Sequence, residues 1–222
     1  ILLEACRAAS VTRLVHVGTD ESYGALPLDQ PDRRFTESSP LRPRSPYAAS
    51  KTAADLMALA WYETYGLPVI VTRCSNNFGG YQFPEKVIPL FVTNLIDQKK
   101  VPLYGDGLNV RDWVHVTDHC EALLRVLEAG RPGEVYNIGG NNEQSNIELT
   151  RSILDLMGFG EEMIDWVEDR PGHDRRYAID ASKIQQELGW VATRSAWPEA
   201  LAETIEWYRT HEAWWRPLQT GA

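Results

Sequence analysis

The stretch 45-SPYAASKTAADLMALAWYETYGLPVIVTRC-74 decides the fold class of this chain of 222 residues. Its first part is typical of a helix, because Ser45 can cap the free N–H groups, Pro46 suits the first helical position and Gly66 follows the last turn. Its second part, residues 68–74, is a mainly apolar run of the kind that parallel sheets bury on both faces. A helix that leads into a buried strand predicts an α/β fold with a mostly parallel sheet.

The alternation of helices and strands continues on both sides of this stretch. Before it we expect an opening helix, a strand at Leu14–Val17 and a polar loop up to Arg44. After it we expect helices at 85–99, 117–130 (with Thr117 as its cap), 145–158, 182–190 and 197–215, strands at 101–105, 109–116 and 134–140, and loops at 75–86 and 169–180. This order predicts a Rossmann-like, doubly wound parallel sheet in residues 1–84 and a smaller, mixed α/β substrate-binding domain in residues 85–222, with a return crossing to the sheet.

Composition and charge exclude several classes of function. A hydrophobic content of 43% supports a packed core, and the net charge of −9 argues against a nucleic-acid or anionic-membrane surface. Three widely spaced cysteines are typical of reduced thiols in a cytoplasmic protein rather than of disulfides or a zinc site. His115 and His119 have a metal-ligand spacing, but a strand is expected at His115, so we predict no metal.

Two short patterns carry candidate chemistry. Tyr47 and Lys51 lie one helical turn apart, where an ammonium can lower the pKa of a phenol and make it a base. An ordinary helix face with an exposed lysine is the alternative. Thr19, Asp20 and Glu21 follow the first strand directly, which fits either a solvated turn or a reactive group at the carboxyl edge of the sheet.

Taken together, these patterns resemble a known family. A threonine after one strand with Y-x-x-x-K on the next helix is similar to the extended short-chain dehydrogenase/reductase superfamily, and Thr19-Asp20-Glu21 is similar to its sugar-nucleotide 4,6-dehydratases. The resemblance to the dTDP-glucose 4,6-dehydratase family extends over nearly the whole chain through 73-RCSNNFGGYQFPEKVIPL-90, 102-PLYGDGLNVRDWVHVTDHC-120, 136-YNIGG-140 and 169-DRPGHDRRYAID-180.

The resemblance implies a reaction on dTDP-glucose with tightly held NAD. In that reaction NAD would take a hydride from C4 while Tyr47 would take the hydroxyl proton and Thr19 would hydrogen-bond the C4 oxygen. Glu21 would then remove the C5 proton, Asp20 would donate a proton to the departing C6 hydroxyl, and the hydride would return to C6. An acid beside a base requires environments that separate their pKa values. The product would be dTDP-4-keto-6-deoxyglucose, a precursor of deoxysugars.

The resemblance also implies the binding residues. Tyr47, Lys51 and Asn77 would contact the nicotinamide side of NAD, although Asn76 and Asn77 could also be plain turn residues. The substrate contacts would be Thr19, Asn76, Lys86, Val87, Pro102, Leu103, Tyr104, Arg111, Asn146, Asp169, Arg170, Pro171, Gly172 and His173. Arginines suit a diphosphate because their planar fork binds two oxygens. Arg175 and Arg176 could be a solvated basic patch and are not assigned to the site.

Some features depart from the family pattern. Gly18 stands where Ser or Thr is usual, and Ser22 stands where Val is usual. The G-x-x-G-x-x-G turn that seats the cofactor pyrophosphate is not in the sequence, so we expect an N-terminal part of the NAD-binding domain to be missing and the chain alone not to retain NAD. The alternatives are a related dehydratase or epimerase acting on a UDP-sugar or other NDP-sugar, and a non-catalytic sugar-nucleotide-binding remnant. The resemblance also implies a homodimer, with Thr52–Tyr65 as part of its surface.

Overall fold

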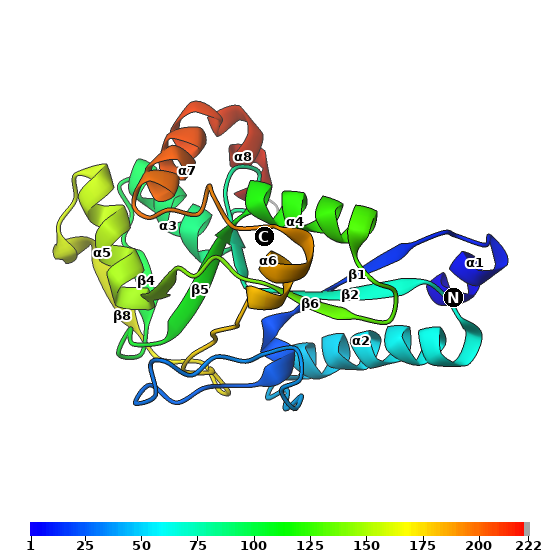
Figure 1. Cartoon of the computed structure of the whole chain (residues 1–222). Coiled ribbons are helices and arrows are strands. Elements are labelled where there is room, and N and C mark those ends of the chain that lie inside the picture. Colours follow the sequence, from blue (N-terminus) through cyan, green and yellow to red (C-terminus); the bar gives the residue numbers. More distant parts are fainter. Residues whose placement is uncertain (220–222) are drawn as a thin grey trace.

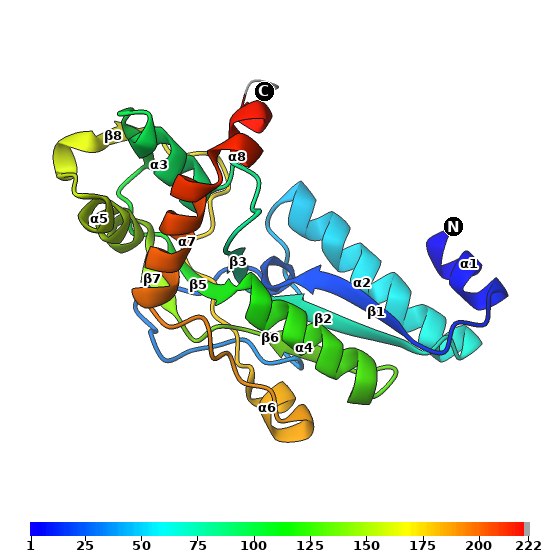
Figure 2. The ribbon, with the colours of Figure 1, turned by 90° about the horizontal axis from the view of Figure 1, so that it is seen from above.

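The computed structural model describes residues 1–219. At its centre is a parallel sheet of β1 (Leu14–Thr19), β2 (Val69–Cys74) and β6 (Val135–Ile138), in the order β1-β2-β6. Helix α2 (Pro46–Tyr65) covers one face of this sheet and α4 (Val116–Ala129) covers the other (Figures 1 and 2). The predicted α/β fold with a parallel sheet is confirmed. Because β6 pairs with β2, the chain returns to the sheet beyond residue 84, and the division at that residue stays a prediction.

The deciding stretch folds as its sequence predicts. The Ser45 Oγ accepts a hydrogen bond from the Ala48 N–H at 3.0 Å, and α2 ends at Gly66, whose φ of 66° is the left-handed conformation that glycine adopts without a steric penalty. Residues 69–73 of β2 are all buried, since α2 and α4 cover the two faces of the strand. The mainly apolar run therefore forms a central strand.

The second part of the molecule packs around a separate core. It contains β3 (Asn76–Phe78), β5 (Val110–His115) and β7 (Glu143–Ser145) in one sheet, the parallel pair β4 (Val101–Tyr104) and β8 (Ile164–Val167), and helices α3 (Val87–Ile96), α5 (Asn146–Met157), α7 (Glu199–Thr210) and α8 (Glu212–Gln219). The remaining elements are α1 (Leu2–Ala8), the 3₁₀ turns η1 (Asp20–Tyr23) and η2 (Glu161–Met163), and α6 (Ser182–Leu188). Figure 1 shows α3, α5, α7 and α8 gathered at the end opposite α1.

Several predicted boundaries are wrong. Strand β1 continues through Gly18 to Thr19, and helix α3 is shorter than residues 85–99 at both ends. Helix α4 is capped by His115 rather than Thr117, because the His115 Nδ1 accepts the Thr117 N–H at 3.2 Å. The expected single helix over 197–215 is two helices, α7 and α8, separated at His211.

Three short strands were not predicted. Strand β3 lies in the expected loop 75–86 and pairs with β5, while β7 pairs antiparallel with β5, and β8 pairs with β4. Each has three or four residues without a clear apolar pattern, so it is stabilised as a strand by its partner rather than by its own sequence.

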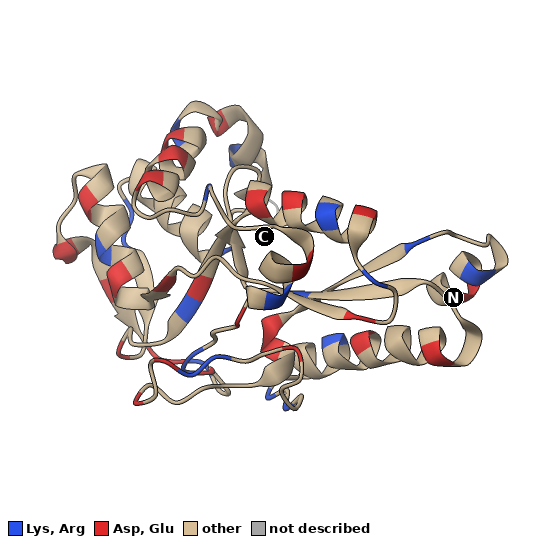
Figure 3. Ribbon diagram, in the orientation of Figure 1, with Lys and Arg blue, Asp and Glu red and all other residues tan. Residues whose placement is uncertain are grey.

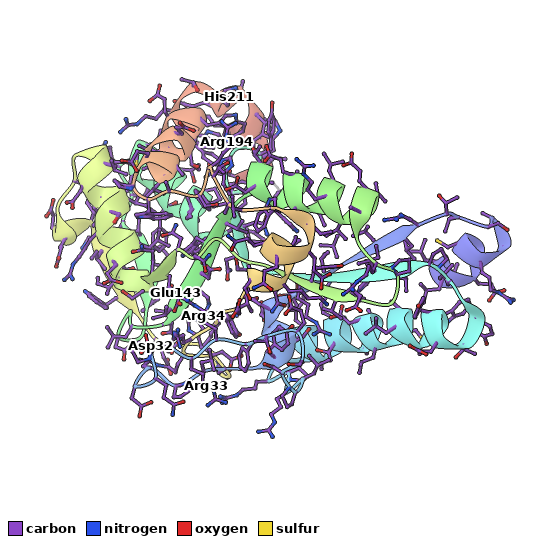
Figure 4. All side chains as sticks on the ribbon, in the orientation of Figure 1. Asp32, Arg33, Arg34, Glu143, Arg194 and His211 are labelled. Atoms are coloured by element: carbon purple, nitrogen blue, oxygen red, sulfur yellow. The ribbon has the colours of Figure 1, made fainter. Side chains whose placement is uncertain are left out.

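Arg176 holds the loop between β1 and α2 in place. Its side chain is buried, donates to the backbone carbonyls of Gln30, Pro31 and Arg33, and forms an ion pair with Glu143 at 2.7 Å. Arg34 reaches the same carboxylate at 3.1 Å, and Figure 4 shows Arg34 and Glu143 side by side. Arg176 is therefore a structural clamp, and the alternative of a solvated patch is wrong for this residue.

Charges are mixed elsewhere on the surface. Helix α4 carries three acidic residues, Asp118, Glu121 and Glu128, and one arginine, Arg125 (Figure 3). No helix within residues 1–219 is long and apolar enough to cross a membrane.

The N-terminus of α5 gives a direct test of local stability. Ser145 and Glu148 form a reciprocal capping box, in which the Ser145 Oγ accepts the Glu148 N–H and Glu148 accepts the Ser145 N–H at 2.9 Å. We expect Ser145→Ala to lower the free energy of unfolding by about 1 kcal/mol. Ser152→Ala, in the interior of the same helix, should be neutral or slightly stabilising in the same urea titration. Equal effects of the two substitutions would contradict the capping role.

Candidate functional site

The Thr19-Asp20-Glu21 turn is not a solvated turn. It lies at the carboxyl end of β1, where Thr19 is in register with Cys74 at the end of β2. The Thr19 Oγ1 accepts the Glu21 N–H at 3.3 Å and donates to the Asp20 Oδ1 at 3.4 Å. Asp20 has only 3% of its surface exposed. A buried carboxyl at a strand end is unusual and needs an electrostatic explanation.

Burial raises the pKa values of both carboxyl groups above those of ordinary surface acids. It raises the pKa of Asp20 to about 8, with further contributions from the neighbouring charges of Glu21 and Asp112. Burial also raises the pKa of Glu21, which is opposed by the positive charges of Arg111 and Arg170. At neutral pH, Asp20 is thus mainly protonated and can donate a proton, while Glu21 has two nearby cations that favour its carboxylate.

Tyr47 and Lys51 lie on α2 beside this turn, but the predicted effect of Lys51 on Tyr47 is not found. The Lys51 Nζ donates to the Val17 carbonyl at 2.9 Å. The pKa of Tyr47 is raised by burial and by the charges of Glu21, Cys74 and Asp20, although 55% of its surface is exposed. The expectation of a lowered Tyr47 pKa is therefore wrong, because burial of the phenol and the neighbouring acidic groups raise it.

A pocket of about 360 Å³ is lined in part by Arg111 and Arg170, whose charges act on Glu21 of the turn. Ten of the fourteen predicted substrate residues line it: Asn76, Lys86, Val87, Pro102, Leu103, Tyr104, Arg111, Asn146, Arg170 and His173. Thr19, Asp169, Pro171 and Gly172 do not line it, although the Asp169 Oδ1 lies 2.7 Å from the Nδ1 of His173. The tertiary structure thus brings segments far apart in the sequence to one cavity.

Four further lining residues were missed by sequence reasoning, namely Glu85, Leu90, Phe91 and Trp113. Leu90 lies three positions after Val87 on α3, so helical spacing could have predicted it. Trp113 lies two positions after Arg111 on β5 and therefore on the same face of that strand. Glu85 carries no such signal.

Arg111 connects the pocket to the acidic turn. Its guanidinium lies 4.3 Å from the centre of the Tyr177 ring and donates to the Asp174 carbonyl at 2.9 Å. The Tyr177 hydroxyl in turn donates to the Asp174 carboxylate at 2.6 Å. Arg111 also lines the pocket and interacts with the charges of Asp20 and Glu21, so its positive charge acts both in the pocket and on the acidic turn.

Asn77 has its amide orientation fixed by its neighbours. Its Nδ2 donates to the Ser75 carbonyl at 3.1 Å, so its Oδ1 accepts from the His119 Nδ1 at 2.8 Å. Burial lowers the pKa of His119 to about 4, which keeps the ring neutral. His115 caps α4 instead of sharing a site with His119, and no group of three or more His, Cys, Asp or Glu side chains in residues 1–219 is placed to hold a metal.

Comparisons with known proteins show the family of the chain. A family model described as GDP-mannose 4,6 dehydratase matches residues 1–202. The chain belongs to this family. It is similar to dTDP-glucose 4,6-dehydratase from Streptomyces niveus, with 52% identity over 220 residues, which is 99% of this chain and 64% of that protein.

Solved structures of the family have the same fold. The structure of dTDP-glucose 4,6-dehydratase from Bacillus anthracis in complex with NAD is 56% identical, with a TM-score of 0.92 over 98% of this chain and 68% of that one. DesIV, the dTDP-glucose 4,6-dehydratase from Streptomyces venezuelae solved with NAD, is 52% identical, with a TM-score of 0.94 over 98% of this chain and 66% of that one. The chain thus spans slightly less than two thirds of the length of the Streptomyces niveus relative.

The raised pKa of Asp20 predicts a pH dependence of stability. The folded protein retains a proton on Asp20 until the pH approaches 8, whereas the unfolded chain releases it near 3.8, so this group makes folding less favourable as the pH rises between those values. Relative to the unmutated protein, Asp20→Asn should therefore gain stability from about pH 5 to about pH 8, by up to roughly 1.4 kcal/mol per pH unit. Urea unfolding at several pH values measures the difference, with the exposed Asp29→Asn as control. A difference that is constant with pH would contradict the assignment.

Proposed function

We propose that the protein dehydrates dTDP-glucose to dTDP-4-keto-6-deoxyglucose, with NAD as its cofactor. The observation that carries the proposal is the burial of Asp20, which raises the pKa of its carboxyl, directly beside Glu21, because a dehydration needs an acid and a base in one turnover. The names of the most similar relatives and structures support the same substrate and cofactor. The reaction is balanced as one hexose giving one keto-deoxyhexose and one water.

The residues present fit a nicotinamide dinucleotide at the carboxyl ends of β1 and β2. The Tyr47 side chain is exposed there, Lys51 offers an ammonium, and Asn77 offers a side chain fixed by its hydrogen bonds. The exposed Val17 adds an apolar surface suited to a flat ring. When bound, NAD would accept the C4 hydrogen with its electron pair and return it at C6. This edge of a parallel sheet is where such folds bind nucleotides.

The chain's own side chains would then move the protons. Tyr47 would take the proton of the C4 hydroxyl. To lower the pKa of its phenol, the Lys51 ammonium would have to leave the Val17 carbonyl and move closer to the phenol. Thr19 would donate a hydrogen bond to the C4 oxygen. Glu21 would remove the C5 proton that the 4-ketone acidifies, and Asp20 would donate its proton to the C6 hydroxyl, which leaves as water.

The pocket would hold the nucleoside diphosphate. Arg111, Arg170 and Lys86 supply positive charge for the two phosphates, and Asn76 and Asn146 supply amides. Leu103, Tyr104 and Val87 give apolar and aromatic surface for the base. Asp169, Pro171 and Gly172 would shape the segment that carries Arg170 and His173. These polar and apolar groups together suit a nucleotide better than a free sugar.

We also propose that the protein is a cytoplasmic homodimer. The unpaired Cys6, Cys74 and Cys120 support a reducing compartment. The exposed Leu56, Met57 and Tyr65 of α2 support a dimer surface on that helix, outside the pocket.

The assigned base can be tested by substitution in the full-length gene product. We expect Glu21→Gln to lower kcat on dTDP-glucose by a factor on the order of 10²–10⁴, because the amide cannot accept the C5 proton. Mass spectrometry of the nucleotide sugar detects the loss of water. The exposed Glu128→Gln on α4 should retain the unmutated rate. A rate for Glu21→Gln within a few-fold of the unmutated protein would show that the base is assigned wrongly.

The diphosphate contact can be tested without turnover. Arg111→Lys keeps the charge but loses the planar fork, so we expect the Kd for dTDP to rise by roughly 10-fold or more. Arg175→Ala is the matched control, since Arg175 pairs with Asp106 and does not line the pocket. Isothermal titration measures both. Equal affinities of the two variants would remove Arg111 from the phosphate site.

A further inference from the structure

Helix α2 carries a third polar residue on the face of Tyr47 and Lys51. Asp55 follows Lys51 by four positions, so the three side chains lie on one side of the helix. Unlike the other two, Asp55 is completely buried, against the sheet. Its Oδ2 accepts from the Nε of Arg73 on β2 at 2.9 Å, and Arg73 is itself buried. An ion pair thus joins α2 to the central strand inside the protein.

Arg73 also reaches the acidic turn. Its NH1 donates to the Tyr23 hydroxyl at 3.0 Å, and its guanidinium lies 4.9 Å from the centre of the Tyr23 ring. Tyr23 belongs to η1, the same short turn as Asp20 and Glu21. The Tyr23 hydroxyl in turn donates to the Oδ1 of Asn137 on β6 at 2.7 Å. One buried arginine therefore joins α2, β2 and η1, and the tyrosine extends the network to β6.

A buried ion pair of this kind does not necessarily add net stability. Removing two charges from water is costly, and a buried ion pair can often be replaced by apolar residues without loss of stability. The strand packing around it is unusually close, because a β carbon at Gly18 would lie 2.6 Å from the Asp55 Oδ1 and 2.8 Å from the Thr72 carbonyl oxygen. Glycine at position 18 thus leaves room for the Asp55 carboxylate.

We propose that Arg73, Asp55 and the Tyr23 hydroxyl are positioning residues that fix the acidic turn of Asp20 and Glu21 relative to α2 and its Tyr47 and Lys51. The catalytic consequence rests on the proposed function, in which groups from both elements act on the same hexose ring. C4 and C5 are neighbouring atoms, so a shift of the turn against α2 would separate the base from its proton. A misplacement of about 1 Å can slow an enzyme by on the order of 100-fold.

Two variants of the full-length gene product test this proposal. Tyr23→Phe removes only the hydroxyl and leaves the ring stacked on Phe35, and Arg73→Lys keeps a charge for Asp55 but cannot bridge to Tyr23 as well. Tyr136→Phe is the matched control, because its hydroxyl bonds Glu187 at 2.8 Å, away from the turn. Each protein is compared by amide hydrogen exchange of residues 19–24 and by kcat and KM for dTDP-glucose.

We expect faster exchange in residues 19–24 of both variants but not of Tyr136→Phe, and a kcat lowered by roughly 10-fold or more with KM within about 3-fold. Unchanged exchange in both variants would overturn the positioning role, as would a rise in KM at constant kcat. If the unmutated protein has no turnover on dTDP-glucose, the proposed function fails. The exchange of residues 19–24 still decides whether the network holds the turn.

Discussion

The parallel pairing of β1 with β2 is the constraint on which the rest of the structure depends. It places Thr19 in register with Cys74, so the polar residues that follow each strand converge at one edge of the sheet. Helix α2 then packs under both strands and brings Tyr47 and Lys51 to the same edge. A slip of one residue would move every side chain of the strand to the opposite face of the sheet.

Burial at this edge sets the chemistry of the site. Burial raises the pKa of Asp20, whereas the charges of both Arg111 and Arg170 oppose the rise in the pKa of Glu21. Two carboxyl groups adjacent in sequence therefore have different surroundings, which is how proteins assign acid and base roles. Arg111 is itself held by Tyr177 and the backbone carbonyl of Asp174, so the segment 169–180 influences the turn through this arginine.

The buried polar groups have a common role in assembling the two parts of the molecule. Arg176 and Glu143 hold the loop that joins β1 to α2, and Asp118 accepts hydrogen bonds from Thr193, Arg194 and Ser195. Each of these buried side chains exchanges its hydrogen bonds to water for several hydrogen bonds within the protein, which makes one arrangement of the loops much more favourable than others. The pocket is consequently lined by segments that are distant in sequence but fixed in space.

The sequence by itself determined the α/β class, helix α2 with its Ser45 cap, the buried strand β2 and most of the pocket-lining residues, because periodicity, capping residues and motif strings are local signals. It could not give β7 and β8, which are strands only through their partners, nor the break between α7 and α8 at His211. It also misjudged the pKa of Tyr47, since burial of the phenol and the neighbouring acidic groups raise it. Only the tertiary structure decided which charges are buried and which cations face them, because desolvation and Coulomb energies depend on distance in space and not along the chain.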